Sequence, residues 1–101
     1  MVINVTKENF EQEILNGTQK ILVDFWASWC APCRMLAPVV EEFANEHAQI
    51  KVCKINIDED SELAMKYKVM SIPTLVVFQD GEVVNKSVGV ISKEEIEALL
   101  A

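Results

Sequence analysis

The chain has 101 residues, half of them apolar, which is enough to bury the core of one domain without a disulfide or metal framework. Sixteen Asp and Glu residues against nine Lys and Arg residues give a formal net charge of −7. No basic stripe is available to neutralise phosphates, so we expect neither nucleic acid nor an anionic membrane as a partner.

The chain shows no sign of export, of membrane insertion or of a second domain. The first eight residues lack the basic start and apolar stretch of a secretory signal, and no apolar run approaches the roughly 20 residues of a membrane helix. No linker, repeat or low-complexity tract divides residues 1–101. We therefore expect a single domain, a cytoplasmic location and a monomer.

The first predicted elements are a short strand, a helix and a long apolar strand. Residues 2–5 are apolar enough for a strand, and Thr6 can cap a helix that runs to residue 15 before Gly17 stops it. Residues 21–27 form an almost continuous apolar run of strand length. Such a run is typical of a strand that is covered on both faces.

The middle of the chain predicts a long helix, a second buried strand and a short helix. From residue 32 to about residue 47 the apolar residues recur at helical spacing, and Pro38 inside this helix is expected to kink it. Residues 50–57 are predicted to form a central strand, and residues 61–67 a short helix.

The last quarter predicts a hairpin followed by a helix. The turn Asp80-Gly81 separates strand candidates at residues 74–79 and 82–88, and Ser92 with Glu95 forms a capping box that opens the final helix. The predicted order is β-α-β-α-β-α-β-β-α. Because alternating strands and helices need parallel crossovers, we expect a three-layer α/β domain with a mixed sheet.

Two cysteines stand where the long apolar strand leads into the long helix. Cys30 is placed at the helix N-terminus, where unpaired backbone N–H groups and the helix dipole favour a negative thiolate. Pro32 suits the first turn, since its missing N–H would have had no partner there. Cys33 follows three residues later, so both sulfur atoms can lie on one side of that turn and close a disulfide.

Two other interpretations of the pair are a zinc half-site and an inert packed pair. Zinc needs about four ligands, and the other candidates here, Cys53 and His47, match no zinc-finger spacing. In a reducing compartment a close cysteine pair is redox-active or metal-binding rather than structural. We therefore expect redox chemistry and no metal.

At this point the sequence resembles the thioredoxin family, and the resemblance extends from the first strand to the last helix. Five segments carry it in order: Val23-Asp24-Phe25-Trp26-Ala27, Trp29-Cys30-Ala31-Pro32-Cys33, Ile55-Asn56-Ile57-Asp58, Ser71-Ile72-Pro73-Thr74 and Val88-Gly89. The resemblance implies the thioredoxin fold, a central mixed sheet of about five strands flanked by four helices in three layers. It also implies a protein-disulfide reductase with Cys30 as nucleophile and Cys33 as resolving thiol.

Asp24 is the one charged residue in its apolar strand. An unpaired buried carboxylate is costly and tends to hold its proton at neutral pH. The resemblance implies that Asp24 is a buried acid/base for Cys33 and that Lys54 modulates it. The alternative is a structural ion pair between Asp24 and Lys54 on the neighbouring strand.

The resemblance also implies how a substrate protein is bound. The Ile72-Pro73 peptide would be cis and face the disulfide, leaving the Ile72 backbone free to pair with an extended substrate by β-strand addition; the alternative is a plain turn proline. An apolar collar around Cys30 would consist of Trp29, Ala31, Pro32, Ile72, Pro73, Gly89 and Val90.

Four further residues receive plainer interpretations. Trp26 is expected mainly in the core, although it would also wall the site, and Arg34 is either a cation of the site or an ordinary exposed helix residue. Cys53 is expected to be an inert buried side chain, and His47 to end a helix where a cation is mildly favourable.

Two positions depart from the family pattern. Ala31 replaces the glycine that is usual between the cysteines, which leaves the activity intact but puts the redox potential in doubt. Lys68 follows Tyr67 where the family often has glycine, and if the backbone there needs a positive φ, lysine costs about 1 kcal/mol.

The resemblance implies partners for a cycle of electron transport and cell redox homeostasis. These are disulfide-containing substrate proteins and a flavin-containing, NADPH-dependent thioredoxin reductase, with no cofactor bound to this chain. Two rivals are an oxidase or isomerase of the disulfide-forming branch and a binding subunit without turnover. Pro32 argues against the first rival, since those relatives tend to carry histidine there.

Overall fold

The computed structural model describes residues 1–101 and contains the predicted order of strands and helices. The elements are β1 (Ile3–Asn4), η1 (Glu11–Leu15), β2 (Ile21–Trp26), α1 (Ala31–Glu46), β3 (Lys51–Asn56), α2 (Ser61–Lys66), β4 (Thr74–Gln79), β5 (Glu82–Val88) and α3 (Lys93–Leu99). No helix is both long enough and apolar enough to cross a bilayer.

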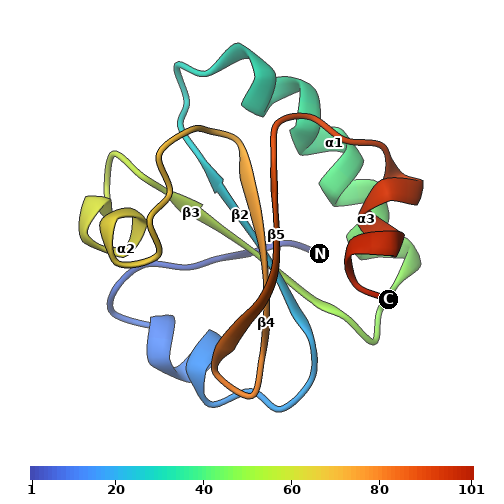
Figure 1. The fold of residues 1–101 in the computed structure, drawn as a ribbon, viewed down its shortest axis with the longest axis horizontal. Coiled ribbons are helices and arrows are strands. Elements are labelled where there is room, and N and C mark those ends of the chain that lie inside the picture. The colour runs from blue at the N-terminus through green and yellow to red at the C-terminus, as the bar shows by residue number, and fades with distance from the viewer.

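The five strands form one mixed sheet in the order β1-β3-β2-β4-β5. β2 lies at its centre, parallel to β3 and antiparallel to β4. Helices cover both faces: η1 and α2 lie on one side of the sheet, and α1 and α3 lie on the other (Figure 1). This arrangement confirms the predicted three-layer α/β architecture and the thioredoxin fold.

The core is divided by the sheet into two apolar clusters, and β2 contributes to both. Ile21, Val23 and Phe25 belong to the cluster that also contains side chains of η1 and α2. Leu22 belongs to the cluster with Leu36 and Val40 of α1 and with residues of α3. Because successive strand residues point to opposite faces, Asp24 faces the α1 side of the sheet together with Leu22.

The first helix differs from its prediction. Residues 7–9 form a turn, and only Glu11–Leu15 are helical, with the wider π spacing in which the Asn16 N–H donates to the Glu11 carbonyl at 3.0 Å. Thr6 does not cap a helix as predicted. Its hydroxyl accepts a hydrogen bond from the Glu8 N–H, while the Asn9 side chain accepts from the Thr6 N–H; these bonds close the turn over residues 7–9, and the helical segment begins only after Phe10.

The hairpin and the final helix confirm their predictions. Asp80 and Gly81 both have positive φ, 54° and 79°, which is the geometry that an Asp-Gly turn supplies between twisted antiparallel strands. At α3, the Ser92 hydroxyl accepts from the Glu95 N–H and the Glu95 carboxylate accepts from the Ser92 N–H, which completes the capping box.

The long helix α1 continues through Pro38 without a break.

Lys68 adopts φ 57° immediately after α2, as its departure from the family pattern suggested. The Val69 N–H donates to the Ala64 carbonyl and the Lys68 N–H to the Met65 carbonyl, the paired bonds of a Schellman motif. In that motif the residue at the position of Lys68 is left-handed and is usually glycine.

We expect Lys68→Gly to raise the free energy of unfolding by up to about 1 kcal/mol, because it removes the Cβ clash of a left-handed residue. Lys68→Ala is the matched control, since it removes the same side chain and keeps the Cβ. Urea melts of the three proteins measure this difference. A glycine variant no more stable than the alanine variant would show that the left-handed backbone carries no cost here.

Candidate active site

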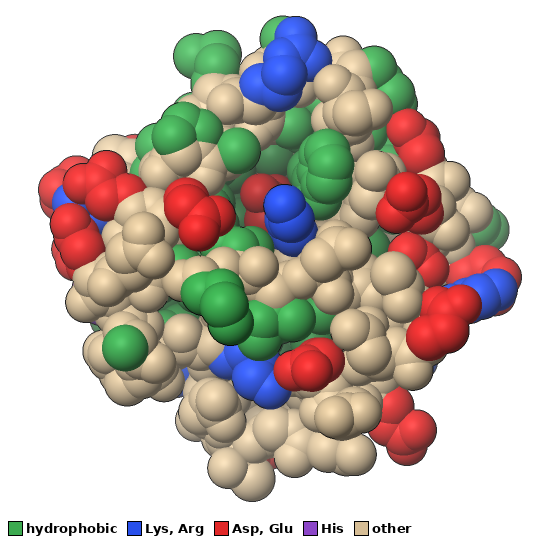
Figure 2. Space-filling model, turned by 180° about the vertical axis from the view of Figure 1, so that it is seen from behind, with side chains coloured by type: hydrophobic (Ala, Val, Ile, Leu, Met, Phe, Trp, Pro, Cys, Tyr) green, Lys and Arg blue, Asp and Glu red, His purple; other side chains and the backbone are tan.

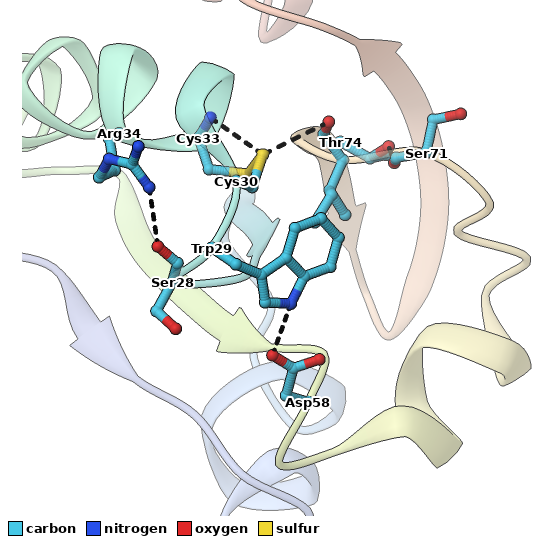
Figure 3. The surroundings of a disulfide bond; sticks show 9 residues. Ser28, Trp29, Cys30, Cys33, Arg34, Asp58, Ser71 and Thr74 are labelled. Atoms are coloured by element: carbon cyan, nitrogen blue, oxygen red, sulfur yellow. Dashed lines mark hydrogen bonds between the residues drawn. A yellow bond between two sulfur atoms is a disulfide. The ribbon is translucent and has the colours of Figure 1, made fainter.

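The cysteine pair occupies the start of α1, as predicted. Cys30 is the N-cap residue, with extended backbone angles, and Cys33 lies in the first turn with Pro32 before it. The two residues form a disulfide with their Cα atoms 5.2 Å apart. The Cys33 N–H points at Cys30 Sγ, 3.2 Å away (Figure 3). A backbone donor that helix formation leaves unpaired is thus aimed at the first sulfur.

Exposure alone does not distinguish the two cysteines. Cys30 is 5% exposed and Cys33 3%, so both are largely buried in the disulfide form. They form a small apolar cluster with Ala27, against which Trp26, Ile57 and Ile72 pack. The difference between them lies in position, because Cys30 is the member at the N-cap and beside Ile72.

The loop before β4 faces Cys30, as the resemblance implied. The Ile72-Pro73 peptide is cis, and the Ile72 carbonyl oxygen lies 3.8 Å from Cys30 Sγ. The Ile72 N–H has no hydrogen-bond partner within the molecule. The Gly89 N–H donates to the Pro73 carbonyl at 2.9 Å, which holds the segment after β5 against this loop. An unpaired backbone segment therefore lies directly beside the disulfide.

The apolar collar is partly assembled in the structure. Trp29 is 66% exposed and Val90 42%, while Ile72 is partly buried against the cysteine cluster. Gly89 adopts φ 99°, where a side chain would be strained, and thereby places Val90 next to the Pro73 loop. Ala31 and Pro32 are exposed in the first turn of α1. Their roles in binding stay predictions.

Two polar contacts at the site were not foreseen. The Trp29 indole N–H donates to the Asp58 carboxylate at 2.8 Å, and Figure 3 shows the ring reaching from the loop before α1 to the loop after β3. Arg34 donates to the Ser28 carbonyl at 2.9 Å, so it braces the loop that carries the cysteines. Asp58 could have been found, since it follows β3, the parallel neighbour of β2, and parallel strands end at the same edge.

Asp24 is 5% exposed and is paired in register with Lys54 of β3. No ion pair joins them within 4 Å; the Lys54 ammonium instead lies 5.6 Å from the centre of the Trp26 ring. The alternative of a structural ion pair is therefore wrong. Burial raises the pKa of Asp24 to about 7, and the charge of Lys54 opposes this rise only in part.

A cavity of about 110 Å³ connects Asp24 with the second cysteine. It is lined by Asp24, Trp26, Cys33, Arg34, Ala37 and Lys54. On the face shown in Figure 2, a hollow near the centre is bordered by hydrophobic, acidic and basic side chains, the three kinds that line this cavity. The volume is large enough for water between the carboxyl group and Cys33.

Trp26 belongs to this cavity more than to the core. It is only partly buried and packs against the cysteine cluster rather than in either large core cluster, so its assignment mainly to the core was wrong. Its indole N–H and Asp24 Oδ1 are the two buried side-chain atoms without a hydrogen-bond partner. Trp26 lines the cavity because it is two residues after Asp24 in β2, and residues two apart in a strand point to the same face of the sheet.

The two remaining candidate ligands lie apart from the site. Cys53 is fully buried in β3, and burial raises the pKa of its thiol to about 12. His47 ends α1, where its ring stacks on Phe43 and one nitrogen lies 3.2 Å from the Glu97 carboxylate. No three His, Cys, Asp or Glu side chains come together as a metal site requires.

We expect Asp24→Ala to be more stable than wild type at pH 8 by on the order of 1–3 kcal/mol, because it removes an unpartnered buried carboxyl group. The native state holds the Asp24 proton up to about pH 7, whereas the unfolded chain releases it near pH 4. The contribution of Asp24 to wild-type stability is therefore lost as pH rises through this window, and the advantage of the variant should shrink at pH 5. Denaturant melts at both pH values measure this.

Asp60→Ala is the control for that measurement. Asp60 is buried to a similar degree, but its carboxylate accepts a hydrogen bond from the Lys7 N–H at 3.0 Å, so its loss should destabilise the fold at both pH values. An Asp24→Ala protein that is less stable than wild type at both pH 5 and pH 8 would contradict the claim that the unpartnered Asp24 carboxyl group destabilises the fold.

The three thiols of the reduced protein should differ in reactivity. At neutral pH we expect iodoacetamide to modify Cys30 first and Cys53 last, since the raised pKa and full burial of Cys53 leave almost no accessible thiolate. Peptide mapping over time gives the order. Early labelling of Cys53 would instead identify it as a redox-sensitive thiol.

Comparison with known proteins matches the whole chain. A sequence model of the family described as Thioredoxin matches residues 1–101. The thioredoxin of Pseudomonas aeruginosa is 47% identical over 98% of this chain and 93% of its own length, and that of Alicyclobacillus acidocaldarius is 49% identical over 98% and 94%. Thioredoxin 1 of Synechococcus elongatus is 50% identical over 88% of this chain and 84% of its own length.

Proposed function

The chain belongs to the thioredoxin family of thiol–disulfide oxidoreductases, and we propose that it reduces disulfides in partner proteins through Cys30 and Cys33. The observation that carries the proposal is the placement of Cys30: an N-cap sulfur with the Cys33 N–H 3.2 Å away and an unpaired backbone segment beside it. Such a sulfur is stabilised as a thiolate, and it lies beside a backbone segment with which an extended chain can pair.

In the first step the Cys30 thiolate attacks one sulfur of the partner's disulfide. A bond forms between Cys30 Sγ and that sulfur, the partner's S–S bond breaks, and the other partner sulfur leaves as a thiolate that takes up a proton. The Cys33 N–H and the dipole of the sixteen-residue α1 both favour the negative charge on Cys30 before attack.

In the second step Cys33 resolves the mixed disulfide. Its thiol loses a proton toward Asp24, directly or through water in the cavity that both residues line, and the thiolate attacks Cys30 Sγ. The bond to the partner breaks, the partner leaves fully reduced, and the Cys30–Cys33 disulfide seen here remains. With its pKa raised to about 7, Asp24 can accept and return a proton near neutral pH.

The partner is held mainly by its backbone. An extended segment can pair with the Ile72 backbone, whose N–H is free and whose carbonyl faces Cys30, while the exposed Trp29 and Val90 contact its side chains. Backbone pairing reads no particular sequence, so the chain is suited to many disulfide proteins. Trp29 is kept in place by its hydrogen bond to Asp58.

The cycle closes when another protein reduces the Cys30–Cys33 disulfide. We assign that step to an NADPH-dependent thioredoxin reductase, whose flavin supplies the electrons, so that this chain needs no bound cofactor. In this role the protein is a cytoplasmic monomer that serves electron transport and redox homeostasis. The family membership and the Cys30–Cys33 disulfide support the assignment.

The reductive direction, rather than the oxidative one, rests on the redox potential of the pair. A reductant should have a potential well below that of the glutathione pool, with each 30 mV equal to about 1.4 kcal/mol. Equilibration with glutathione measures it. A potential above that of glutathione would assign the chain to the disulfide-forming branch.

We expect Cys30→Ser to abolish reduction of insulin and Cys33→Ser to trap covalent mixed disulfides with substrate proteins. The first variant lacks the nucleophile, and the second forms the mixed disulfide but cannot resolve it. Turnover assays and non-reducing gels separate these outcomes, and Cys53→Ser serves as the control cysteine variant. If Cys30→Ser trapped partners and Cys33→Ser did not, the two roles would be reversed; wild type without turnover would indicate a binding subunit.

A further inference from the structure

The accessible sulfur atoms of the oxidised protein are those of its methionines. All four methionines are exposed, Met1 by 80%, Met35 by 65%, Met65 by 76% and Met70 by 92%. The three cysteines are at most 5% exposed, and two of them are joined in the disulfide. An oxidant that meets this form of the protein therefore encounters thioethers before thiols.

Met70 differs from the other methionines in its place on the chain. It precedes Ser71-Ile72, and the Ile72 carbonyl oxygen lies 3.8 Å from Cys30 Sγ. Two residues of extended chain span at most about 7 Å, so the Met70 backbone lies within that distance of Ile72. Figure 1 shows the segment between α2 and β4 passing beside the segment that opens α1.

The backbone N–H groups at Met70 and Ser71 are unpaired in the same way as that of Ile72, although the Ser71 carbonyl accepts a hydrogen bond from the Thr74 hydroxyl. Neither the Met70 nor the Ser71 N–H takes part in a hydrogen bond within the molecule. A partner strand that pairs with Ile72 and continues along the loop would pass Met70. Its thioether is flexible and polarizable, which suits contact with many different partner surfaces.

We propose that Met70 is a peroxide-sensitive modification site whose oxidation weakens the docking of protein substrates. This inference rests on the function proposed above and names a regulation of the same surface. The reaction is a two-electron oxidation: hydrogen peroxide transfers one oxygen to Met70 Sδ, its O–O bond breaks, and water leaves. The thioether becomes a sulfoxide while the peroxide is reduced.

The consequence follows from the change of polarity. A sulfoxide is polar and chiral, so it no longer fits an apolar partner surface, and enzymatic reduction of the sulfoxide restores the original side chain. The thiol chemistry at Cys30 and Cys33 is untouched, because both sulfur atoms are protected in the disulfide during exposure to peroxide. The modification should therefore act on KM and leave kcat unchanged.

The test treats the disulfide form with hydrogen peroxide, reduces the disulfide with dithiothreitol, and measures initial rates with insulin. Peptide mapping should show sulfoxide at Met70, and KM for insulin should rise about threefold to tenfold, the loss of one side chain's apolar contact. The rate with 2-hydroxyethyl disulfide, a substrate too small to use the docking loop, should not change.

Matched variants assign the effect to one residue. In Met70→Leu, peroxide should no longer change KM, so the ratio of KM after and before treatment should be about one. Met65→Leu is the control, since Met65 is also exposed but belongs to α2, and its ratio should equal that of wild type. Met70→Gln, which carries a polar side chain of similar length, should have a raised KM without peroxide.

Several results would overturn the proposal. One is a KM for insulin that stays constant although Met70 is oxidised, and another is a peroxide effect on kcat instead of KM. The others are a Met65→Leu protein whose KM is as resistant to peroxide as that of Met70→Leu, and a Met70→Leu protein whose KM rises as in wild type. Failure of the proposed function would appear separately and earlier, as untreated wild-type protein that does not reduce insulin.

Discussion

The structure depends on the burial of β2 at the centre of the sheet. This strand pairs with β3 on one side and β4 on the other, and its residues fill the core on both faces. A strand so constrained has little freedom in where it ends, so the loop that follows it and the N-terminus of α1 are fixed as well. Cys30 owes its position to this constraint, since only three residues separate it from the end of β2.

The same strand brings an ionisable group into the core. Asp24 has to occupy the α1 face because its neighbours Val23 and Phe25 fill the opposite one. There the carboxyl group finds no hydrogen-bond partner for Oδ1 and no ion pair, but it shares a cavity with Cys33. In the proposed mechanism, a group that we expect to destabilise the fold at neutral pH is thus placed beside the thiol that must lose a proton, which is the trade between stability and function expected at an active site.

The surface around the disulfide combines fixed and adaptable parts. Trp29 is held by Asp58, Arg34 braces the loop through Ser28, and the Gly89 N–H holds the Pro73 loop. By contrast, the Ile72 N–H is unpaired and Met70 is almost fully exposed. Under the proposed function, a rigid nucleophile beside an open backbone segment would let one site act on many partners, and it would also leave an oxidisable side chain on the docking path.

Much of this molecule follows from local properties of its sequence. Apolar periodicity located the strands and the three α-helices, the Asp80-Gly81 turn and the Ser92 capping box marked their ends, and the Cys30–Cys33 spacing after a strand identified the redox pair. These features depend on backbone preferences and neighbours a few residues away. The first helix begins later than predicted, because Thr6 and Asn9 close a separate turn before it, which periodicity does not register. Only the tertiary structure decided that Trp29 meets Asp58, that Ile72 meets Cys30 and that Lys54 leaves Asp24 unpaired. Those contacts join residues 29, 42 and 30 positions apart, and their geometry is set by how the sheet packs rather than by any local pattern.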